Sequence, residues 1–69
     1  MTRDAAEKVI RGLLDASAAL NETVRLVEAE APDALEDYRR RTAEVMAAIY
    51  LDLIKPIVKD YPDLDPGNE

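Results

Sequence analysis

Apolar residues in the first half of the chain recur every three or four positions, which is the period of an α-helix. Residues 2–30 contain no proline and are rich in residues that favour helices. Thr2 is a suitable N-cap for such a helix. We therefore predict one amphipathic helix over about residues 3–30, with a continuous heptad seam. The seam positions are Ala6, Ile10, Leu13, Ser17, Leu20, Val24, Val27 and Ala31.

A second helix is predicted after the proline at position 32. Pro32 disfavours helical geometry at Ala31 but suits the first turn of a new helix. We expect this helix over about residues 33–55, with a kink or short helix over residues 56–61 because Pro56 interrupts it. A connection this short makes the two helices antiparallel neighbours. The predicted fold is thus an all-α, antiparallel two-helix hairpin over residues 1–60.

The end of the chain is rich in residues that favour turns. Its sequence, DYPDLDPGNE, contains two prolines, a glycine and several acids. We predict an extended, partly mobile acidic tail over residues 61–69, with Tyr61 and Leu64 tucked back against the hairpin.

The second half of the second helix is too apolar for a single neighbour. With a regular rotation of about 100° per residue, apolar side chains spread over roughly 240° of its circumference, whereas one partner helix needs little more than about 100°. Beside its main seam, the first helix has a second row that consists of small residues. These are Gly12, Ala16, Ala19 and Thr23. We predict that two hairpins dimerise into a four-helix bundle. The interface would contain Gly12, Ala16, Ala19, Met46, Tyr50, Leu51, Ile54, Ile57 and Val58. Two alternatives are that residues 57–64 fold back over this surface, or that a different protein occupies it.

The amino-acid composition argues against several classes of function. The 69 residues include no cysteine and no histidine, so neither a disulfide nor a zinc site can strengthen a small core, and association is favoured. The net charge of −6, from 15 acids and 9 bases, argues against general binding to nucleic acid or to anionic lipid. No apolar run has the length of a membrane span, and the first residues lack the apolar core of a signal peptide. We expect a cytoplasmic protein, and the abundant alanine, with arginine preferred to lysine, hints at a bacterial source.

No constellation of residues predicts catalysis, a cofactor or a metal site. Asp52 is a lone acid among apolar neighbours, but it shares a narrow polar sector with Glu44, Lys55 and Lys59, which is typical of a solvated helix face. Catalytic pairs usually need histidine or cysteine, so an enzyme class is disfavoured. The tail fails as a calcium-binding loop because Gly67 falls one position early and the sequence stops before the required glutamate.

A run of arginines supplies the one alternative that involves nucleic acid. Arg39, Arg40 and Arg41, together with Arg25, are candidates for contacts with RNA phosphates. The spacing of Glu36–Arg40 and of Asp37–Arg41 instead favours ion pairs within the helix. The predicted architecture is similar to that of the Rop-type RNA-binding regulators, and this resemblance implies a dimeric RNA-binding regulator. The residues themselves favour a non-catalytic protein–protein interaction or regulatory protein that works as a homodimer.

Overall fold

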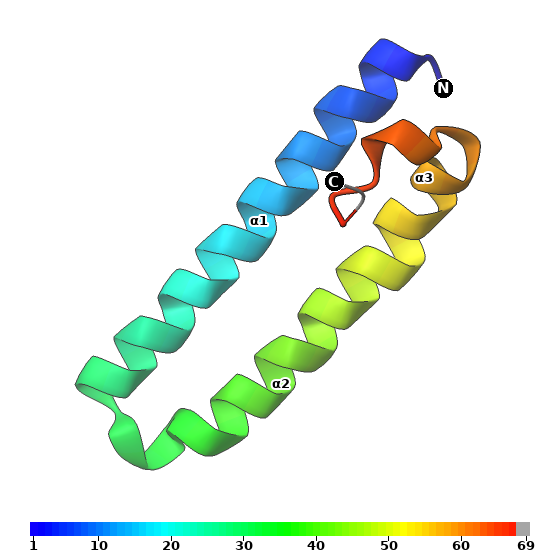
Figure 1. The fold of residues 1–69 in the computed structure, drawn as a ribbon. Helices are drawn as coiled ribbons and strands as arrows, with labels where there is room; N and C mark the ends of the chain where they lie inside the picture. The colour runs from blue at the N-terminus through cyan, green and yellow to red at the C-terminus, as the bar shows by residue number, and fades with distance from the viewer. Residues whose placement is uncertain (68–69) are drawn as a thin grey trace.

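The structure is a computed structural model that describes residues 1–67 as two long antiparallel helices followed by a short C-terminal segment (Figure 1). Helix α1 spans Arg3–Glu30 and helix α2 spans Leu35–Ala48. A single 3-10 turn, Pro32–Ala34, joins them. The prediction of an all-α helical hairpin is confirmed, although α2 begins two residues later than expected.

Local sequence signals account for both ends of α1. The Thr2 hydroxyl accepts a hydrogen bond from the backbone N–H of Ala5 at 3.1 Å, as expected of an N-cap. At the other end Ala31 leaves helical geometry (φ −144°, ψ 60°) directly before Pro32. Every seam position from Ala6 to Val27 is buried or partly buried, so the heptad seam is the surface that contacts α2.

The second helix is interrupted before Pro56 rather than at it. Residues Ile49–Ile54 form a π-helical segment, and the N–H of Lys55 bonds to the carbonyl of Tyr50, five residues back. Helix α3, Lys55–Asp60, follows and has Pro56 in its first turn, where no N–H donor is needed. A proline ring clashes with the carbonyl four residues back in a regular helix, and the wider π-turn relieves this clash.

The π-turn changes which residues are buried. It contains one residue more per turn than an α-helix, so all later side chains are rotated by about 100° relative to a regular helix. Ile54 is consequently 2 % exposed and packs with Ile10 and Val58 in the core. The prediction that Ile54 and Val58 belong to an exposed dimer interface is therefore wrong, because both side chains are buried within one chain.

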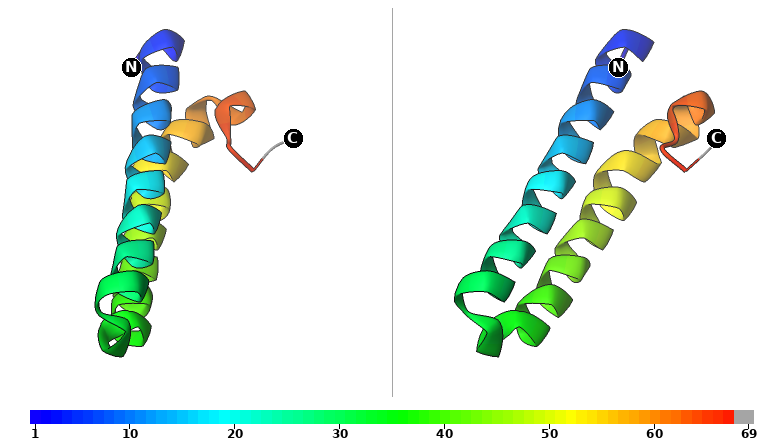
Figure 2. Two further views of the ribbon diagram at one scale, coloured as in Figure 1. Left: turned by 90° about the vertical axis from the view of Figure 1, so that its left-hand side faces the viewer. Right: turned by 60° about the vertical axis from the view of Figure 1, so that its left-hand side comes forward.

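The C-terminal segment forms turns instead of extending, with Tyr61 and Leu64 tucked back against the hairpin as predicted. Pro62–Leu64 form a 3-10 turn, the Tyr61 hydroxyl donates to the carbonyl of Met1, and Leu64 packs against the core. Seen edge-on, this segment projects to one side of the hairpin (Figure 2). The predicted mobility falls partly on residues 68 and 69, which lie outside the described residues.

Truncating Leu64 tests whether this folded-back segment contributes to stability. Leu64→Ala removes a partly buried side chain and is expected to lower the free energy of unfolding by about 1 kcal/mol. For a domain of this size that corresponds to a fall of about 4–8 °C in the melting temperature. Pro66→Ala, at an exposed position nearby, is the control and should change the melting temperature by less than about 2 °C. Equal melting curves for the two variants would mean that the segment is not attached in solution.

Candidate interaction surface

The hairpin is one helix layer thick, and the C-terminal segment covers part of one of its two sides (Figure 2). Leu64 lies at a groove of about 180 Å³ on α1. The groove is lined on α1 by Glu7, Arg11 and Leu14, which lie along one flank of the helix because they are three or four residues apart. Ala18, four residues after Leu14, lies on the same flank. We call this flank, with the segment over it, the tail face.

The opposite side of the hairpin is uncovered and apolar. In α1 the row of small residues is extended by Val9 at one end and by Leu26, which is 61 % exposed, at the other. Tyr38 of α2 donates a hydrogen bond to the Thr23 hydroxyl at 2.7 Å, which places Tyr38 at the same side. Val45 is two helical turns after Tyr38 and therefore lies on the same side of α2; it is 50 % exposed. We call this side the open face and define it as Val9, Gly12, Ala16, Ala19, Thr23, Leu26, Val45 and Ala48.

The structure does not bring the predicted dimer interface together as one patch. Three of its members are exposed on the open face, at Gly12, Ala16 and Ala19. Ile54 and Val58 are in the core, and Ile57 packs beside them. The remaining members do not belong to the open face: Met46 is partly buried on α2, and Tyr50 and Leu51 are exposed on the π-helical segment.

Four residues of the open face were not predicted, and the sequence carried a signal for the two that lie on α1. Val9 precedes Gly12 by three positions, and Leu26 follows Thr23 by three, so both continue the alternating spacing of the small row. The row is therefore a second heptad seam, exposed at every position except Thr23, which Tyr38 contacts. Charged residues are depleted at the centres of protein interfaces, and all eight residues of the open face are uncharged.

Most of the arginines proposed for RNA contact form ion pairs with acidic residues of their own helix. Arg40 and Arg41 both bond to Asp37, at 2.6 Å and 2.8 Å, and Arg25 bonds to Glu22 at 2.6 Å. The predicted Asp37–Arg41 pair is thus confirmed, whereas Arg40 bonds to Asp37 rather than to Glu36. These exposed pairs neutralise most of the positive charge. RNA binding through these side chains and Arg39 stays a prediction.

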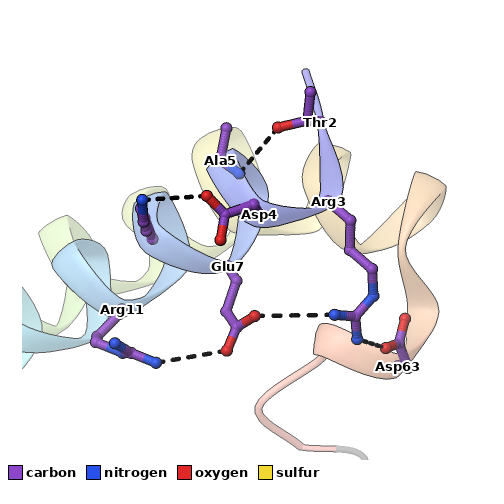
Figure 3. A network of polar contacts seen from close by, with 8 residues as sticks. Thr2, Arg3, Asp4, Ala5, Glu7, Arg11 and Asp63 are labelled. Atoms are coloured by element: carbon purple, nitrogen blue, oxygen red, sulfur yellow. Dashed lines mark hydrogen bonds and ion pairs between the residues drawn. The ribbon is translucent and has the colours of Figure 1, made fainter.

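A polar network fastens the C-terminal segment to the start of α1 (Figure 3). Arg3 pairs with Asp63 and also lies 3.8 Å from Glu7, which Arg11 contacts at 3.4 Å. The hydrogen bond from Arg3 lowers the pKa of Asp63 below the ordinary value of an aspartate. Each of these side chains is about half exposed or more, so the network positions the segment and adds little stability.

The Arg3–Asp63 contact gives a testable pKa difference. Because the folded chain lowers the pKa of Asp63, this contact favours folding above the ordinary aspartate pKa and is lost as the pH falls through the lowered value. An NMR titration of the Asp63 carboxyl group should give a midpoint below that of an unperturbed aspartate. The midpoint should return to the ordinary value in Arg3→Gln. A normal midpoint in the parent chain would show that the two side chains do not meet in solution.

The acidic side chains within residues 1–67 do not gather into a metal-binding group. Asp52 is exposed, as expected for a residue on a solvated sector, and Tyr50 beside it is also exposed. Within residues 1–67, no group of three or more acidic side chains is arranged to hold a metal ion. The open face is therefore the feature from which function can be argued.

Comparisons with known proteins and the search for membrane spans add no functional assignment. No helix among residues 1–67 is both long enough and apolar enough to cross a bilayer. No protein-family model matches this chain, and neither a curated protein nor a solved structure matches it. What the protein does must therefore be inferred from its own residues.

Proposed function

We propose that this chain is a small non-catalytic interaction or regulatory protein that works as a homodimeric four-helix bundle. The observation that carries the proposal is the amount of surface that one chain leaves exposed. A folded monomer of 7.7 kDa is expected to expose roughly 4300 Å². This chain exposes 5150 Å², an excess of about 800 Å². One partner in a standard protein interface buries about the same area.

The small core of a single chain supports the same proposal. Among residues 1–67, the only apolar residues that are almost fully buried are Ala6, Ile10, Ile54 and Val58, all near the open end of the hairpin. The radius of gyration is 14.3 Å, whereas a compact chain of this length is expected to have about 11 Å. A second hairpin stacked on the first would supply the missing burial without needing histidine, cysteine or a cofactor.

Thermal unfolding at several protein concentrations tests the proposal. If folding is coupled to dimerisation, the melting temperature rises with protein concentration, by several degrees for each tenfold increase. The control is the same series in a dimer-disrupting variant, in which the melting temperature should be lower and independent of concentration. A melting temperature of the parent chain that does not change over a thousandfold range would contradict the proposal.

A further inference from the structure

The open face of α1 is symmetric in sequence about one point. Its positions form the pairs Val9 with Leu26, Gly12 with Thr23, and Ala16 with Ala19, and every pair is centred between residues 17 and 18. If two copies of α1 pack antiparallel across a two-fold axis at this point, each member of a pair lies opposite the other member in the second copy.

The open-face residues of α2 also have a centre, and it lies at nearly the same level along the hairpin as the centre on α1. Val45 and Ala48 are symmetric about a point between residues 46 and 47. Ile10 and Ile54 belong to one core cluster, so the centres on α1 and α2 lie within about one helical turn of each other along the hairpin. The same axis therefore sets Val45 of one copy against Ala48 of the other.

Gly12 independently indicates a close approach by another chain. A glycine in the middle of a helix costs about 1 kcal/mol relative to alanine. Gly12 has no positive φ that would require glycine, and a Cβ atom added to it would meet nothing within 4 Å apart from its chain neighbours and the adjacent backbone of its own helix. Nothing within the hairpin explains this glycine, whereas a helix packed closely against the open face would.

We infer that the open face binds the open face of a second copy, with α1 antiparallel to α1 and α2 antiparallel to α2 about a two-fold axis at the level of Ala16 and Ala19. This inference rests on the proposed homodimer and assigns the surface that forms it. The chain's own C-terminal segment is not the occupant, because it lies on the tail face (Figure 2). The excess exposed area matches what one partner buries in such a pair.

Two alanines of α1 provide a matched test of the surface. Ala16 and Ala18 are both exposed, but Ala16 is on the open face and Ala18 continues the tail face. We expect the parent chain and Ala18→Arg to have the mass of a dimer by light scattering, and Ala16→Arg to have the mass of a monomer at the same concentration. A dimer for all three proteins would overturn the assignment of the surface but leave the homodimer intact. A monomeric parent chain would overturn both.

Cysteine cross-linking tests the symmetry and does not depend on the arginine variants. The chain has no cysteine, so a single introduced thiol reports one contact. Mixing Ala16→Cys with Ala19→Cys should give a disulfide-linked heterodimer under mild oxidation, because these positions face each other across the axis. Val9→Cys alone should give no dimer, since two copies of residue 9 would lie about 25 Å apart along α1. Efficient cross-linking of Val9→Cys with itself, or none of Ala16→Cys with Ala19→Cys, would overturn the antiparallel arrangement.

Discussion

Ile54→Ala is expected to lower the free energy of unfolding by about 2–5 kcal/mol, which is the usual cost of removing a large aliphatic side chain from a core. Ile54 is 2 % exposed and contacts the cluster formed with Ile10 and Val58. A domain of this length has only about 3–10 kcal/mol of stability in total. The variant should therefore lose much of its helical circular dichroism at temperatures at which the parent chain is folded.

Leu51→Ala is the matched control for this prediction. Leu51 belongs to the same π-helical segment, but it is 54 % exposed and lies outside the open face. Its replacement should change the free energy of unfolding by no more than about 0.5 kcal/mol, as is usual at exposed sites. If urea denaturation gives equal losses for the two variants, the π-turn does not direct Ile54 into the core.

The second large effect concerns the length of the π-turn. Because this turn holds one residue more than an α-helical turn, removing one residue should leave the later side chains facing α1, provided that the proline clash is also removed. We expect a Pro56→Ala chain that lacks Asp52 to fold with a melting temperature close to that of the parent. The region would then form one regular helix with Ile54 and Val58 still in the core.

An insertion at the same place should have the opposite result. One alanine added after Asp52 in the Pro56→Ala chain rotates Ile54 and Val58 by a further 100° or so, away from α1. This chain should lose its cooperative thermal transition, because the core cluster is broken. Circular dichroism melts of the deletion and the insertion, compared with Pro56→Ala alone, provide the measurement. If both changes weaken the thermal transition equally, the π-turn does not determine which of the later side chains face α1.

The features that were predictable from the sequence depend on local rules. The heptad seam, the Thr2 cap and the break at Pro32 each follow from residue type and spacing within a few positions, and the structure has all three. The open face was partly predictable for the same reason. Gly12, Ala16, Ala19 and Thr23 were identified as one row, and one further step of the same spacing in each direction leads to Val9 and Leu26.

The π-turn could not be predicted in this way because it depends on packing. A constant rotation per residue directs Ile54 and Val58 outward. Pro56 indicates an interruption of the helix, but the extra residue that turns Ile54 and Val58 inward also depends on their contact with α1. Part of the apparent excess of apolar surface on the second helix is therefore core, at Ile54 and Val58, whereas Tyr50, Leu51 and Leu53 stay exposed. Similarly, Arg40 has two acids within reach on its own helix, and its bond to Asp37 rather than Glu36 depends on side-chain rotamers.

Sedimentation equilibrium of the parent chain over a wide range of concentrations tests most directly whether a second copy covers the open face. We predict a mass of about 15 kDa, twice the 7.7 kDa of one chain, that falls toward 7.7 kDa only on strong dilution. A mass of 7.7 kDa at every concentration, with full helical circular dichroism, would contradict the homodimer.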